Sequence, residues 1–205
     1  MIPEFGPQAA LVSCVAAVLV SGFSVLGTWW FGRRAAGYSH LRDTISELGA
    51  TGTTDARAVA WLWFAPSGVI FVVAALALGQ GLGTDDASRA ASILALVGVG
   101  WIGAAIFPCD RGAPAFGTAR NHLHNLTGGG AYLAGAAGLI EMARALEDSH
   151  PLLAMTARVS GPIVLLGLFL ISLPEIPVRG LIQRVMEAIL HGWLVFAAIV
   201  ARTIR

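Results

Sequence analysis

Residues 9–32 read AALVSCVAAVLVSGFSVLGTWWFG, a stretch without a single charged side chain. About 20 apolar residues are enough to cross the hydrocarbon core of a membrane as a helix. A cleavable secretory signal has a positively charged start and a shorter apolar stretch, whereas residues 1–8 carry Glu4 and no basic residue. The stretch therefore predicts a retained transmembrane helix.

The rest of the chain repeats this pattern. The 205 residues are 56% hydrophobic and 12% charged, with a mean hydropathy of +0.74, whereas soluble domains carry about 25% charged residues. The sequence predicts one all-α domain over residues 1–205, an integral membrane bundle of six transmembrane helices. The expected spans lie near residues 9–32, 58–82, 88–107, 126–147, 152–173 and 185–203.

Six spans place both termini on one side of the membrane. We name this side A, with connections 83–87 and 148–151, and the opposite side B, with connections 33–57, 108–125 and 174–184. Side B carries eight arginines: Arg33, Arg34, Arg42, Arg57, Arg111, Arg120, Arg179 and Arg184. Side A carries five: Arg89, Arg144, Arg158, Arg202 and Arg205. Basic loops favour the cytoplasm, so side B is expected to be cytoplasmic in a bacterial cytoplasmic membrane.

The first long connection contains SHLRDTISELG at residues 39–49. Ser39 is a suitable N-cap and Gly49 a suitable stop, so the segment predicts a short amphipathic helix. Asp43 and Glu47 would then lie one turn apart and could share a proton, which makes them the leading acid–base pair. Asp43→Asn and Glu47→Gln are each expected to abolish activity. The alternative is a solvated loop helix with a polar outer face.

Further ionisable residues fall at or within the predicted spans. Such residues are costly in a membrane, usually face the bundle interior and indicate function. The candidate catalytic residues are Asp43, Glu47, Asp110, His124, Glu187 and His191. For the last two, the alternative is a salt-bridge ladder with Arg184 that only locks helices together. No metal is expected; the His122-x-His124 pair could contribute to a zinc site only with further ligands.

Arginines and tryptophans complete the predicted site. Arginine could tune the acids or hold an anionic head group, and a tryptophan face could steady a cationic group. The candidate substrate-binding residues are Arg42, Arg111, Arg120, Arg184, Trp61, Trp63, Trp101 and Trp193. The alternative for the tryptophans is a one-sided interfacial belt with core packing.

Two runs carry a resemblance to a known family. YSHLRDTISELGA at 38–50 and FPCDRG at 107–112, followed by a histidine at 122 or 124, resemble the bacterial membrane family labelled domain of unknown function 998. The resemblance covers nearly the whole chain and implies a six-helix bundle but no activity. A weaker likeness to seven-helix zinc hydrolases is not carried over, because their H-x-x-x-H pair and one helix are missing.

These observations support an integral membrane enzyme that uses acid–base residues near side B on a lipophilic substrate. An isoprenoid (terpene) cyclase or isomerase is the expected type, with a membrane lipid or other lipophilic small molecule as partner and no cofactor. The alternatives are a metal-dependent lipid hydrolase, in which zinc would be bound, a proton-coupled transporter or carrier, and a non-catalytic partner subunit. Thirteen basic residues against twelve acidic ones, without a basic run, give no reason to expect nucleic acid.

Overall fold

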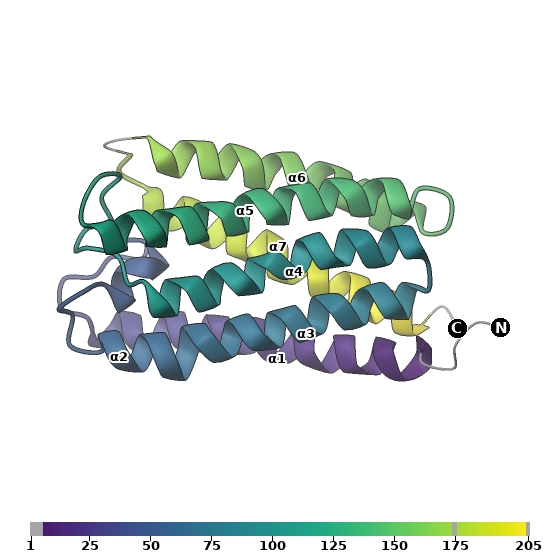
Figure 1. The fold of residues 1–205 in the computed structure, drawn as a ribbon, viewed down its shortest axis with the longest axis horizontal. Helices are drawn as coiled ribbons and strands as arrows, with labels where there is room; N and C mark the ends of the chain where they lie inside the picture. The colour runs from purple at the N-terminus through teal and green to yellow at the C-terminus, as the bar shows by residue number, and fades with distance from the viewer. Residues whose placement is uncertain (1–5, 174–175, 204–205) are drawn as a thin grey trace.

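The computed structural model describes residues 6–173 and 176–203, and all of the long elements in these residues are helices (Figure 1). Glu4, Arg205 and the first two residues of the 174–184 connection lie outside the described residues. Six long helices run side by side: α1 (Gly6–Arg34), the rod formed by α2, η2 and α3 (Ala56–Leu82), α4 (Asp85–Ile106), α5 (Ala119–Ala145), α6 (Pro151–Ser172) and α7 (Arg179–Thr203). Helix α7 lies behind the others in this view and packs against α1, α3 and α6.

The predicted all-helical class is confirmed, and each predicted span coincides with one long helix. Five of them are long and apolar enough to cross a membrane: α1, the α2–α3 rod, α4, α6 and α7. Helix α5 is not among the five, although it packs between α4 and α6.

Helix α5 begins at Ala119, seven residues before the predicted start at 126. The Thr118 side chain caps it by accepting the Asn121 N–H (3.3 Å), and the Asp110 carboxylate accepts the Thr118 N–H (2.8 Å). Because the segment is helical, His122 and His124 do not share a face; His122 is exposed and His124 is buried. The extended H-x-H pair considered for zinc is therefore not formed.

The helix predicted from Ser39 is shorter than expected. Asp43 accepts the Ser39 N–H (2.7 Å), which closes a turn, and only residues Ile45–Gly49 form a 3₁₀ helix, η1. Glu47 accepts the backbone N–H of Thr44 (2.9 Å) in a capping box at its start. The apolar face of η1 is buried in the mouth of the bundle on side B.

The second rod contains a π-helical segment, η2 (Val59–Phe64), just before Pro66. A proline ring inside a helix clashes with the carbonyl four residues earlier, and the wider π turn relieves this clash. At its end the Ala65 N–H donates to the Ala60 carbonyl, five residues back. The segment buries Trp63 and Phe64 against the bundle.

Candidate functional site

A polar stripe runs along the inner face of α7. Gln183, Glu187 and His191 are spaced four residues apart, so they lie on one face of the helix, and each is more than 90% buried. Between them, Met186 and Leu190 are buried as apolar packing. Three polar side chains in the interior of such a bundle need partners, because an unpaired buried polar group is costly.

The partners form a chain whose direction is fixed by its first donor. The Ile45 backbone N–H can only donate, so it binds the Gln183 Oε1 (2.6 Å). Gln183 Nε2 therefore donates a hydrogen bond to the Tyr132 Oη (3.0 Å). The Tyr132 hydroxyl in turn donates a hydrogen bond to the Glu187 Oε1 (2.6 Å). Each donor in this chain points toward Glu187, so the Glu187 Oε1 is the final acceptor of the chain.

The second carboxylate oxygen is the exception. Glu187 Oε2 is buried and has no hydrogen-bond partner, and its nearest ionisable neighbour is the His191 Nδ1 at 3.4 Å. That nitrogen also lies 2.9 Å from the Glu187 carbonyl, an acceptor, so it carries the proton. His191 Nε2 is then the basic nitrogen, in a ring that packs edge-on against Phe71 and Trp101.

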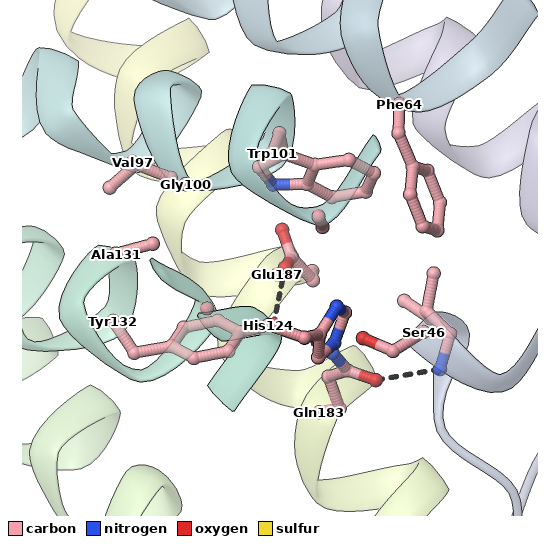
Figure 2. A pocket seen from close by; sticks show the side chains of 13 residues that line it. Ser46, Phe64, Val97, Gly100, Trp101, His124, Ala131, Tyr132, Gln183 and Glu187 are labelled. Atoms are coloured by element: carbon pink, nitrogen blue, oxygen red, sulfur yellow. Dashed lines mark hydrogen bonds between the residues drawn. The ribbon is translucent and has the colours of Figure 1, made fainter. Parts of the chain in front are cut away.

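A small cavity of about 50 Å³, the central cavity, lies on one side of Glu187 (Figure 2). Trp101 and Phe64 form one wall of it, while Tyr132, His124 and Glu187 face it from α5 and α7. A space of this size and polarity has room for about one to three water molecules. His124 Nδ1 donates to the Phe107 carbonyl (2.8 Å), which leaves Nε2 as an acceptor at this cavity.

A larger space, also bordered by Glu187, lies between α1 and α7. This α1–α7 groove has a volume of about 580 Å³ and is lined by Ser21, Ser24, Val25, Thr28, Trp29, His40, Ile45, Arg184, Glu187, Ala188, His191, Gly192 and Val195. Glu187 therefore lies in the wall of both the groove and the central cavity. A volume of 300–1,000 Å³ with few polar groups is typical of small-molecule sites.

Asp43 and Glu47 line a third space, the side-B hollow of about 480 Å³, with Arg34, Arg42 and Arg111. Asp43 pairs with Arg42 (2.6 Å), and this guanidinium holds the pKa of the Asp43 carboxyl below its usual value. Within the described residues, no hydrogen bond joins Asp43 to Glu47. The expectation that these two carboxylates share a proton is therefore not met in this geometry.

The remaining candidates are more scattered. Asp110 caps the loop before α5, where the Thr118 N–H lowers the pKa of its carboxyl. Arg120 and Trp61 are exposed. Trp63 and Trp193 are buried in the core, and the indole nitrogen of each has no hydrogen-bond partner.

The candidates are thus not gathered in one pocket. Most of them line one of the three spaces, whereas Asp110, Arg120, Trp61, Trp63 and Trp193 line none of the three. Tyr132 and Gln183, which hold Glu187, were missed by the sequence analysis. Gln183 had a signal, because it precedes Glu187 and His191 at the same spacing of four. Within the described residues, no three His, Cys, Asp or Glu side chains gather in an arrangement that could hold a metal ion.

Five apolar helices around a buried polar chain define a multi-pass helical membrane protein. A family profile with the description "Protein of unknown function (DUF998)" matches residues 14–200, and the chain belongs to this family. Neither the curated proteins nor the solved structures contain a match to the chain.

Proposed function

We propose that this protein is a membrane-embedded enzyme in which Glu187 exchanges a proton with a lipophilic substrate held in the α1–α7 groove. The observation that carries the proposal is the Glu187 Oε2, a buried oxygen without a hydrogen-bond partner, 3.4 Å from the His191 Nδ1, on a side chain that lines this groove. An ionisable residue inside a membrane protein is expensive and points to function by default.

The surrounding residues supply the parts that acid–base chemistry needs. Tyr132 and Gln183 orient Glu187 through its other oxygen, and His191 offers a second proton-exchanging group in the same groove. Trp29 lines the same groove, and aromatic faces stabilise cations. Protonation of an alkene or epoxide, as in an isoprenoid cyclase or isomerase, fits this set of groups.

The proposal moves the chemistry away from Asp43 and Glu47. Both carboxylates accept hydrogen bonds from backbone N–H groups, Asp43 from Ser39 and Glu47 from Thr44. These hydrogen bonds stabilise the conformation of the side-B loop.

We further propose that all six long helices, α5 included, cross the membrane.

A matched pair of amide substitutions tests the assignment. Glu187→Gln and Glu47→Gln are introduced separately, and lipid extracts of expressing cells are compared with the wild type by mass spectrometry. Glu187→Gln is expected to lower formation of the product lipid about 100-fold or more, the usual contribution of a general acid or base. Glu47→Gln should retain it, because glutamine also serves in a capping box.

Loss in Glu47→Gln with activity in Glu187→Gln would return the chemistry to the Asp43–Glu47 pair. A lipid profile that is identical for wild type, both variants and an empty-vector control would refute catalysis on a membrane lipid.

One observation supports a second candidate, a proton-coupled carrier. Glu187 lines both the central cavity and the α1–α7 groove, an arrangement that could pass a proton between them. Proton uptake into liposomes that depends on Glu187, without any change in lipid chemistry, would favour this function.

A further inference from the structure

The mouth of the α1–α7 groove on side B carries an arginine, Arg184, that forms no ion pair within the described residues. Neighbouring arginines are paired, Arg34 with Asp55 (2.8 Å) and Arg42 with Asp43 (2.6 Å). Arg184, by contrast, has no carboxylate within 4 Å in the described part of the chain.

Neutral acceptors hold the Arg184 side chain in place. Its two terminal nitrogens donate to the Asp43 carbonyl, the Gly180 carbonyl, the Tyr38 hydroxyl and the His40 Nδ1. Its Nε is buried without a partner. The guanidinium is therefore oriented but keeps its full charge.

His40 adds a donor beside this charge. Arginine can only donate, so the His40 Nδ1 that faces it accepts (3.0 Å), and Nε2 of the neutral ring carries the proton. Burial and the Arg184 charge both lower the pKa of His40, which keeps the ring neutral at pH 7. Both residues line the groove.

The length and level of the groove fit one leaflet of a membrane. From Arg184 to Val195 it follows eleven residues of α7, about 16 Å at 1.5 Å per residue, which is roughly half of the hydrocarbon core. Trp29 lines it near the Arg184 end and is half exposed, with the Arg33 guanidinium 4.8 Å from its ring centre. Tryptophan and arginine side chains mark the head-group level of a membrane.

We propose that the α1–α7 groove binds a membrane lipid with a phosphate head group, the phosphate beside Arg184 and His40 and the hydrocarbon chain beside Glu187 and His191. Basic pockets between transmembrane helices recognise such head groups. Here the oriented Arg184 charge would attract the phosphate, and the His40 Nε2–H would donate a hydrogen bond to one of its oxygens. The inference rests on the proposed function only in naming this lipid as the substrate class.

Binding is tested with a matched set of probes on the full chain in a maltoside detergent, which contains no phosphate. Dodecyl phosphate, dodecanol and inorganic phosphate are each added, and retention is measured by native mass spectrometry. We expect one dodecyl phosphate per chain, bound roughly tenfold more tightly than dodecanol, and no retained inorganic phosphate. Equal retention of dodecanol and dodecyl phosphate by the wild type would overturn the phosphate assignment without any variant.

Three variants locate the site. Arg184→Gln should remove the preference for dodecyl phosphate over dodecanol. Gly192→Leu fills the groove without a backbone clash, because nothing lies within 4 Å of a Cβ placed there, and it should reduce retention of both amphiphiles. Gly130→Leu is the matched control, since Gly130 is equally open but lies outside the groove, and it should bind like the wild type. Unchanged binding in Gly192→Leu would place the lipid elsewhere.

Glu187→Gln separates this inference from the proposed function. The variant should still bind dodecyl phosphate while losing lipid conversion. Conversion that needs Glu187, without phosphate-dependent binding, would refute the head-group inference alone. Phosphate-dependent binding with full conversion in Glu187→Gln would refute the catalytic role alone.

Discussion

At the scale of single residues, the direction of the hydrogen bonds that end at Glu187 depends on a backbone donor in a distant segment. The Ile45 N–H fixes the orientation of the Gln183 amide, and the amide fixes the direction of the Tyr132 proton. Burying a polar side chain is costly unless it is hydrogen-bonded, and the hydrogen bond from Tyr132 to Glu187 offsets part of this cost. The loop segment that contains η1 therefore helps to fix the hydrogen bonding of Glu187 in α7.

Tyr132→Phe should destabilise the fold. It leaves the Gln183 Nε2 and the Glu187 Oε1 without a partner in a buried site, which costs about 1–3 kcal/mol for an unsatisfied group. The unfolding temperature of the purified protein in detergent measures the effect. Ser92→Ala is the control, because the exposed Ser92 hydroxyl donates only to its own helix (2.8 Å) and its loss should cost under about 0.5 kcal/mol. Equal unfolding temperatures for both variants would contradict the hydrogen-bonded chain.

Asp110 should make the loop before α5 sensitive to acid. The Thr118 N–H lowers the pKa of this carboxyl in the folded protein, so its contribution to stability is present above the unfolded pKa of about 4 and is lost as the pH falls through the folded value. Hydrogen–deuterium exchange at the Thr118 amide, corrected for intrinsic rates, should show strong protection at pH 7 and weak protection near pH 3. In Asp110→Ala, which has no side-chain acceptor, the protection should be weak at both pH values; strong protection at pH 7 in that variant would contradict the cap.

Some residues of the candidate site could be predicted from the sequence and others could not, because hydrogen-bond partners can lie far apart along the chain. Glu187 and His191 were predicted because an ionisable residue inside a span needs a function. Tyr132 was missed because it is 55 residues from Glu187, and spacing along one helix says nothing about a contact with another helix. Asp43 and Glu47 were preferred because a regular helix was expected where Asp43 instead closes a turn.

At the scale of helices, hydropathy located the long helices well but not their ends. Apolar length determines where a chain can cross a membrane, so each predicted span has its helix. The start of α5 depends on the Thr118 cap and on Asp110, both outside the apolar stretch. Pro66 follows the π-helical segment η2, a local feature that hydropathy does not record.

Close packing between α3 and α4 depends on two glycines that face each other. A Cβ added at Gly68 would overlap the Gly98 carbonyl oxygen, and a Cβ at Gly98 would overlap that of Gly68. Small residues at such contacts let membrane helices approach closely. The two backbones cannot accept a methyl group between them without moving apart.

Gly98→Ala should therefore lower the unfolding temperature, because the displaced helices lose contacts over their whole interface. Gly130→Ala is the control; nothing lies within 4 Å of its added Cβ, and alanine favours a helix by about 1 kcal/mol relative to glycine. Thermal unfolding in detergent should separate the two variants in opposite directions. A Gly98→Ala protein as stable as Gly130→Ala would show that α3 and α4 are not in close contact.

At the scale of the whole molecule, the two ends of the bundle differ. The side-B loops are tied to each other and to α7: the Thr51 N–H donates to the Cys109 carbonyl (2.8 Å), and the Leu181 N–H donates to the Leu41 carbonyl (3.0 Å). This layer covers the end of the bundle next to the polar chain (Figure 1). A lipophilic molecule would then reach Glu187 sideways through the α1–α7 groove, directly from the membrane.

The arrangement of six helices also sets the topology. Helix α1 begins and α7 ends at the same end of the bundle, whereas the loop that contains η1 lies at the other end (Figure 1). Reporters fused at the exposed Gly52 and after the C-terminus should therefore report opposite sides of the membrane. The arginine excess on side B predicts that the Gly52 reporter is cytoplasmic and the C-terminal one is not. Since α5 is the helix outside the five most apolar ones, a third reporter at Gly112, before α5, should match Gly52, and one at Ser149, after α5, should match the C-terminus. The same side for Gly112 and Ser149 would mean that α5 does not cross the membrane, and would refute the six-span topology.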